Sequence, residues 1–222
     1  MQPRSFAASA ALVTLVCTFG FVGLLALLHV VRADLDPSWH FISEYEIGRV
    51  GWLMQGAFLL LALANLALLA AVRPALRGVV GTLGTVAFLV GTLGTILGGL
   101  YVTDPVGTLP EAASPSGKIH ALGGGLGLAG VLGTWLVSAA LLRDPAWRPA
   151  RATLSIAIAI FTLGFLVSFV AIATLVGRSG GTFGPDVPVG WPNRIGILAG
   201  CTWLVIVARQ AWRLETRPES VA

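Results

Sequence analysis

Six long apolar stretches, separated by short polar segments, leave this 222-residue chain few ways to fold. A helix needs about 20 apolar residues to cross the roughly 30 Å hydrocarbon core of a bilayer. The expected spans are 6–31, 51–72, 78–101, 119–142, 152–176 and 193–212. The chain has 56% hydrophobic and 11% charged residues, whereas soluble domains carry about 25% charged residues. The sequence therefore predicts an all-α integral membrane protein, with one six-helix transmembrane domain over residues 1–222.

The first stretch has a competing interpretation as a cleavable signal peptide, because Val31-Arg-Ala33 resembles a small-residue cleavage site. It is longer than the usual apolar region of such peptides, about 7–15 residues, which favours a span. Cys17 and Cys201 both lie inside apolar stretches without a Cys-x-x-Cys spacing. We therefore expect packing cysteines and neither a disulfide framework nor a zinc knuckle.

Basic residues indicate the orientation of the chain in the membrane. Six spans place both termini on one side, and the termini with the two loops on that side carry nine of the fourteen Lys and Arg residues. These nine are Arg4, Arg73, Arg77, Arg143, Arg148, Arg151, Arg209, Arg213 and Arg217. By the positive-inside rule both termini are cytoplasmic, and we expect a multi-pass protein of the inner or plasma membrane. The net charge of +4 thus reports topology, and a nucleic-acid partner is not expected.

Four of the ten acidic residues lie within or beside the polar segment 36–49, which separates the first two spans. With Asp36 as N-cap and Pro37 at the first helical position, it predicts a short interfacial helix that ends near Gly48. Asp36, His40 and Glu44 would then share one helix face. The alternative is a membrane-boundary cap, with its acids in solvent and its aromatic residues at the level of the headgroups.

Other polar residues follow or begin the later spans on the same side. Asp104 follows the third span, His120 begins the fourth, and Arg194 begins the sixth. We expect Glu44, Asp104, His120 and Arg194 to meet in one extracytoplasmic pocket, with the first three as catalytic candidates. Carboxylates and imidazoles perform acid-base chemistry when burial and neighbouring charge move their pKa values toward the working pH. A structural lock of paired charges is the alternative.

The remaining candidates would bind a substrate. They are His40, Ser43, Tyr45, Tyr101 and Arg194. The Arg194 guanidinium could pair with a carboxylate, hold an anionic headgroup or extend to the membrane surface. The same residue types also bind zinc, but no HExxH motif is present, so the cofactor, metal included, is left open.

Glycines predict how two of the spans pack. Gly84, Gly91 and Gly98 recur every seven residues, and Gly94-x-x-x-Gly98 and Gly123-x-x-x-Gly127 are small-xxx-small patterns. We expect the third and fourth spans to approach closely through these residues. The alternative is that the missing side chains open a cleft for a lipid or isoprenoid chain.

Several short motifs recur in an order that resembles a known family. They are Ile42-Ser-Glu-Tyr45, Gly51-Trp-Leu-Met54, Thr103-Asp-Pro105, Gly117-x-x-His120 and Gly190-x-x-x-Arg194. Over nearly its whole length the chain resembles the bacterial and archaeal membrane family known as domain of unknown function 998. The resemblance implies a six-helix bundle and points to Ser43, Glu44, Asp104, His120 and Arg194. It carries no activity.

Three function classes therefore stay open. The first is a membrane-embedded enzyme whose extracytoplasmic acid-base pocket acts on a lipid, isoprenoid or other apolar substrate. The second is a protein that binds or transports lipids or amphiphilic small molecules. Coupled transport usually places ionisable groups near the bilayer midplane, where these spans have none. The third is a structural protein that associates with other membrane proteins. We expect membrane lipids as partners and leave the oligomeric state open.

Overall fold

The computed structural model describes residues 5–216, which form a bundle of six long helices without any strand in that range. All six helices are long and apolar enough to cross a membrane. They are α1 (Phe6–Val31), α2 (Trp52–Val72), α3 (Gly78–Leu100), α4 (Pro115–Arg143), α5 (Arg151–Arg178) and α6 (Gly190–Glu215). Three short 3₁₀ helices connect them: η1 (Ile42–Glu46), η2 (Arg73–Ala75) and η3 (Pro145–Ala150). Arg4 and Arg217, which entered the charge count above, lie outside the described residues.

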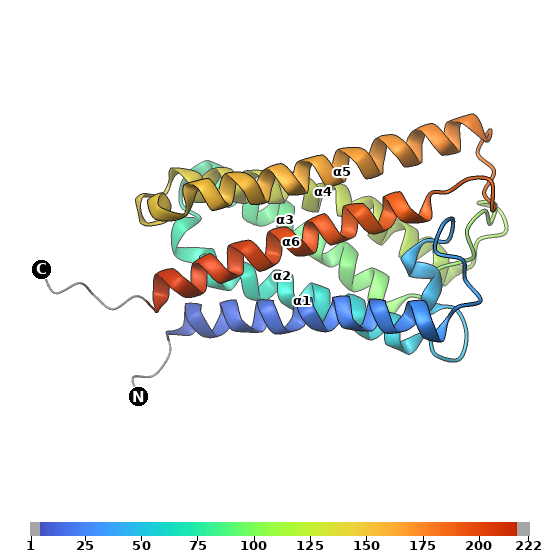
Figure 1. Cartoon of the computed structure of the whole chain (residues 1–222), viewed down its shortest axis with the longest axis horizontal. Coiled ribbons are helices and arrows are strands. Elements are labelled where there is room, and N and C mark those ends of the chain that lie inside the picture. The colour runs from blue at the N-terminus through green and yellow to red at the C-terminus, as the bar shows by residue number, and fades with distance from the viewer. Residues whose placement is uncertain (1–4, 217–222) are drawn as a thin grey trace, which may run out of the picture.

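The bundle has two distinct ends, and both termini lie at one of them (Figure 1). The opposite end, which we call the distal end, consists of residues 32–51, 101–114 and 179–189. The predicted spans agree closely with the helices, and the largest difference is at α4, which begins four residues earlier than expected. The Ser114 hydroxyl accepts a hydrogen bond from the Gly117 amide, and Pro115 occupies the first turn, so α4 has a complete N-terminal cap.

The predicted interfacial helix over 36–48 is wrong in extent, because only η1 is helical there. The Asp36 carboxylate accepts a hydrogen bond from the Ser38 amide at 2.8 Å, which makes a local turn instead of a helix cap. The Glu44 side chain accepts from the Phe41 amide and so starts the helix at Ile42. Gly48, at φ 96°, ends the segment. Asp36 is exposed and does not share a helix face with Glu44.

Helices α3 and α4 make the closest backbone contact in the bundle. A Cβ atom added to Gly91 would collide with the backbone of Gly130, and one added to Gly94 would collide with the Gly123 carbonyl. Gly127 differs, since a Cβ atom there would meet no atom within 4 Å. Gly91 and Gly94 thus allow close backbone contact, whereas Gly127 leaves open space.

Polar links between other helices fix the half of the bundle near the termini. The Trp203 indole of α6 donates to the Ser138 hydroxyl of α4 at 3.0 Å. The Trp135 indole of α4 donates to the Thr162 hydroxyl of α5 at 2.9 Å. In an apolar environment each of these donors needs a partner, so both links hold α4 at a defined distance from α5 and α6.

Candidate functional site

Glu44 ties three segments of the distal end together. It is buried, and its Oε2 atom lies 3.0 Å from His40 Nδ1 and accepts from the Phe41 amide at 3.0 Å. Its Oε1 atom accepts from the Val106 amide in the α3–α4 loop, also at 3.0 Å. Both carboxylate oxygens are therefore occupied, and Glu44 links η1 to the preceding loop and to the α3–α4 loop.

Glu46 makes a second and different set of contacts. Its side chain is fully buried, its Oε2 atom accepts from the Thr103 amide at 3.0 Å, and the same atom lies 3.2 Å from His120 Nδ1. The Oε1 atom is buried without a hydrogen-bond partner in the described part of the chain. Burial raises the pKa of this carboxyl, although the hydrogen bonds from His120 and Thr103 oppose that shift.

His120 has a defined tautomer because of its position. Its Nδ1 atom lies 2.8 Å from the Tyr101 carbonyl oxygen, which can only accept, so Nδ1 carries a hydrogen. Glu46 Oε2 lies 3.2 Å from the same nitrogen. The ring packs edge-on against Phe58 of α2 and lies near Gly98 of α3. Three elements besides α4 thus surround this imidazole.

Asp104 supports the start of α4. Its Oδ2 atom accepts from the Ser114 amide at 2.9 Å, and a Cβ atom on Gly117 would collide with the carboxylate. An aspartate beside the first turn of a helix satisfies free backbone donors and favours the positive end of the helix dipole. The glycine in Gly117-x-x-His120 therefore has a steric reason, since it makes room for this carboxylate.

Arg194 is buried at the start of α6 and forms hydrogen bonds to α1, η1 and the loop before η1. Its Nε atom donates to His29 Nε2 at 2.8 Å, and its Nη2 atom donates to the Tyr45 hydroxyl at 3.1 Å. Its Nη1 atom donates to the carbonyls of His40 and Gly190 at 2.8 and 3.0 Å. Four of the five N–H donors are thereby satisfied, and no carboxylate within residues 5–216 forms a salt bridge with it.

His29 was not among the predicted site residues. Its Nδ1 atom lies 2.7 Å from the Leu25 carbonyl oxygen and so carries a hydrogen, while Nε2 accepts from Arg194. The imidazole in this arrangement is neutral, and both of its nitrogens are in use. A histidine at the end of a span gave no sequence signal, because its partner is 165 residues away along the chain.

The predicted cluster thus separates into three groups. Glu44 pairs with His40, His120 pairs with Glu46, and Arg194 joins Tyr45. In the described range no hydrogen bond directly joins the side chains of Glu44, Asp104 and His120. Ser43 is half-buried and Tyr101 exposed, and their side chains form no hydrogen bond with residues 5–216. The catalytic and binding roles of these residues stay predictions.

Glu46 was missed because the segment was expected to be an α-helix with a ridge through Glu44. Positions two apart point in different directions in a 3₁₀ helix, as they do in an α-helix, so Glu46 lies off the ridge through Glu44. The two carboxylates therefore reach different partners, with Glu44 on His40 and Glu46 on His120. A second acid two residues from the first was the available signal.

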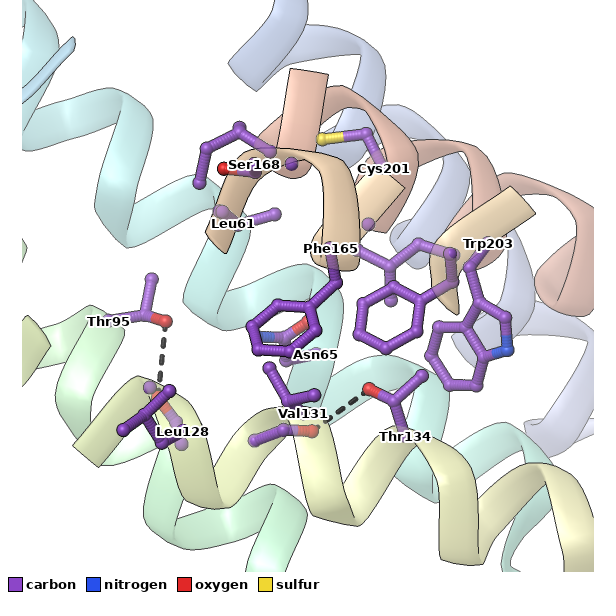
Figure 2. A pocket seen from close by; sticks show the side chains of 18 of the residues that line it. Leu61, Asn65, Thr95, Leu128, Val131, Thr134, Phe165, Ser168, Cys201 and Trp203 are labelled. Atoms are coloured by element: carbon purple, nitrogen blue, oxygen red, sulfur yellow. Dashed lines mark hydrogen bonds between the residues drawn. The ribbon is translucent and has the colours of Figure 1, made fainter. Parts of the chain in front are cut away.

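A cavity of about 500 Å³ lies inside the bundle, between α2, α3, α4, α5 and α6. Its wall is mainly apolar, and no Asp, Glu, Lys, Arg or His lines it. Figure 2 shows its interior, with the Asn65 carboxamide behind the Phe165 ring and with Ser168 and Cys201 along one side. Thr95 and Thr134 bond to carbonyl oxygens of their own helices, so their hydroxyls are already satisfied.

The cavity extends inward from the distal end. On α6 its wall runs from Asn193 to Leu204, a rise of roughly 16 Å along a helix. That length is close to half of the roughly 30 Å hydrocarbon core. Asn193 also joins the cavity to the distal end, because its Oδ1 atom accepts from the Ile42 amide at 3.2 Å.

No three His, Cys, Asp or Glu side chains within residues 5–216 are grouped closely enough to hold a metal ion. No curated protein and no solved structure shows significant similarity to the chain. The family model described as "Protein of unknown function (DUF998)" matches residues 15–210. The match covers α2 to α5, most of α1 and α6, and the residues Glu44, Glu46, Asp104, His120 and Arg194. This multi-pass membrane protein therefore belongs to the DUF998 family.

Proposed function

We propose that this protein binds the apolar chain of an outer-leaflet lipid or isoprenoid in the cavity enclosed by α2, α3, α4, α5 and α6. The observation that carries the proposal is the cavity itself. Its volume of about 500 Å³ falls within the roughly 300–1,000 Å³ of small-molecule sites. Its apolar wall favours a hydrocarbon chain, and its depth suits a chain that occupies one leaflet.

A mouth toward the bilayer supports entry from the side. Leu128 of α4 and Phe169 of α5 line the cavity, yet they are 56% and 52% exposed. Residues that line a cavity and also face outward mark its opening, here between α4 and α5. A ligand dissolved in the membrane would reach the cavity through this opening without crossing the polar distal end.

The placement in the outer leaflet depends on orientation. The arginine distribution favours cytoplasmic termini, which puts the distal end and Glu44, Asp104 and Asp186 on the extracytoplasmic face of the inner or plasma membrane. Reporter fusions after Arg77 and after Pro115 test it: activity of a cytoplasmic reporter is expected only at Arg77. A cytoplasmic reporter active at Pro115 would invert the leaflet assignment.

Filling the cavity tests the binding itself. A Cβ atom at Gly127, which lines the cavity, meets no atom within 4 Å, so Gly127→Leu would place its side chain in the open space. Gly125→Leu is the matched control, because Gly125 lies on the same helix, is exposed, also meets no atom and does not line the cavity. We expect co-purified lipid, measured by native mass spectrometry, to fall at least several-fold in Gly127→Leu and to persist in Gly125→Leu.

Two results would contradict this proposal. One is equal lipid retention by the two variants. The other is a loss of self-association in Gly127→Leu without any loss of lipid, which would assign the opening between α4 and α5 to a second copy of the chain.

A further inference from the structure

We infer that Glu46 and His120 form a general-base site at the distal end of the cavity, directed at the hydroxyl group of an amphiphile or at a water molecule. His120 is the base, and Glu46 is a positioning residue. The inference goes beyond lipid binding, because it assigns a chemical step. The dyad itself stands on its own contacts, and only the identity of the amphiphile rests on the proposed function.

The orientation of the imidazole is the first support. The Tyr101 carbonyl, at 2.8 Å from Nδ1, requires the hydrogen on that nitrogen, and Glu46 Oε2 lies 3.2 Å from the same atom. The other nitrogen, Nε2, is then a free acceptor whenever the ring is neutral. A carboxylate on Nδ1–H is the arrangement that orients a histidine base and stabilises the imidazolium that forms when it takes a proton.

The accessibility of Nε2 is the second support. Only two side-chain polar atoms in residues 5–216 are both buried from solvent and unpaired, namely Glu46 Oε1 and Trp212 Nε1. The hydrogen bonds of residues 5–216 include none at His120 Nε2, although the Gly98 backbone also faces the ring, and this nitrogen is not one of these two atoms. This nitrogen therefore remains reachable, although the His120 side chain is only 13% exposed.

The position of the ring relative to the cavity is the third support. On α4, His120 precedes the cavity residue Gly124 by four positions. Its neighbour Phe58 precedes Leu61 on α2 by three, and Gly98 follows Thr95 on α3 by three. On all three helices the imidazole environment lies one turn, about 5 Å, beyond the cavity wall. The polar end of a molecule whose chain fills the cavity would reach this level.

The other two histidines do not share all these properties. His29 uses both nitrogens, as described above. His40 is also paired with a carboxylate, Glu44, but its loop does not line the cavity, and both Glu44 oxygens accept hydrogen bonds. Glu46 is the carboxylate that keeps one oxygen free beside its histidine.

The proton balance of the step is simple. A hydroxyl or water oxygen bound at Nε2 gives its proton to that nitrogen, and the oxygen becomes the stronger nucleophile. The imidazolium then pairs with the Glu46 carboxylate, and the same proton returns to the oxygen or passes to solvent. From the elements packed on the ring, Glu46 is the charged group that faces it. Helix α2 offers Phe58, Tyr101 offers its backbone carbonyl, and Lys118 on α4 is exposed.

Diethyl pyrocarbonate, a small reagent that acylates neutral imidazole nitrogen, tests the dyad on the full chain in detergent micelles. The modified histidines are mapped by mass spectrometry, and the rate is followed against pH. We expect His120 to react. We also expect Glu46→Gln to move the midpoint of its pH–rate profile down by about one unit, as loss of a nearby opposite charge does. The matched control Glu44→Gln should leave the profile of His120 unchanged.

An unreactive His120, or a profile that Glu46→Gln leaves unchanged, would overturn the inference. If Glu46→Gln does not fold, ¹⁵N NMR of the three histidines in the unaltered protein decides, since the inference requires the Nδ1–H tautomer and a titrating Nε2 at His120. A long-chain alcohol in the cavity should protect His120 from the reagent, and Gly127→Leu should abolish this protection. This measurement tests the cavity separately from the dyad. Reactivity without protection would refute lipid binding and leave the dyad standing.

Discussion

Replacing Gly123 with alanine tests how closely α3 and α4 pack. A Cβ atom on Gly123 would lie 2.6 Å from the Gly94 carbonyl oxygen, and such atoms are essentially never found within 3.0 Å of a neighbour. The helices must therefore separate by at least 0.4 Å, the difference between these two distances. The other near atoms are Leu97 Cβ at 3.1 Å and the Gly98 amide nitrogen at 3.3 Å, so no flexible side-chain end can move aside.

Overpacking of this kind costs about 1–3 kcal/mol. Alanine also favours the helix by up to about 1 kcal/mol over glycine, which would partly hide the clash. Gly125→Ala on the same helix cancels that gain, because a Cβ atom there meets nothing within 4 Å. The difference between the two variants therefore isolates the clash. At about 2–4 °C per kcal/mol for a chain of this size, we expect Gly123→Ala to unfold about 2–12 °C below Gly125→Ala.

Thermal unfolding in detergent, followed by circular dichroism, measures this difference. Gly94→Ala should be lower still, because its Cβ atom would come even closer to the Gly123 carbonyl. Equal unfolding temperatures for Gly123→Ala and Gly125→Ala would refute the backbone contact. The glycines of the two patterns would then serve some purpose other than packing.

Three further predictions concern the distal end. Arg194→Lys should lower the free energy of unfolding by about 3 kcal/mol, since an ammonium cannot reach His29, Tyr45 and two carbonyls at once. The control Arg178→Lys, at an exposed position, should change this free energy little. Equal stability of the two variants would contradict the hydrogen bonds described for Arg194. Asp104→Ala should lower the free energy of unfolding by about 1 kcal/mol, and Asp104→Asn clearly less, because asparagine keeps an acceptor for the Ser114 amide. An equal loss of stability in both variants would point to a role for the charge. Burial raises the pKa of Glu46, so the folded chain binds that proton more tightly than the unfolded chain does. The contribution of this proton to the free energy of unfolding is fully present below the ordinary carboxyl pKa of 4.5 and is lost as pH rises through the raised pKa. Denaturant titrations at pH 4–7 should therefore show a smaller loss of stability with rising pH in Glu46→Gln.

The spans could be predicted well because their signal is local. A run of about 20 apolar residues specifies a membrane helix without knowledge of its neighbours, and α1 begins and ends where expected. The glycine spacing likewise indicated the contact between α3 and α4, since small residues on one face matter whatever their partner is. Even so, spacing alone could not separate Gly123, which contacts α3, from Gly127, which faces open space.

The candidate site was harder to predict, because its partners come from distant segments. Asp36, His40 and Glu44 have the spacing of one helix face, but the turn at Ser38 and the 3₁₀ geometry of η1 remove that face. The choice between Glu44 and Glu46 as the partner of His120 depends on where the α3–α4 loop lies. The glycine pattern suggested a cleft as one interpretation, but the position and size of the cavity result from the separation of five helices, which no local pattern specifies.

A photoreactive phospholipid with a diazirine in its acyl chain tests the central claim, that the cavity holds a lipid chain. After irradiation of the protein in bilayer nanodiscs, mass spectrometry locates the cross-linked residues. We expect them to concentrate on the cavity residues of α4 and α5, around Leu128 and Phe169, and to disappear from both in Gly127→Leu. Cross-links spread evenly over exposed faces such as Val79 and Leu83 of α3, unchanged by Gly127→Leu, would contradict the account.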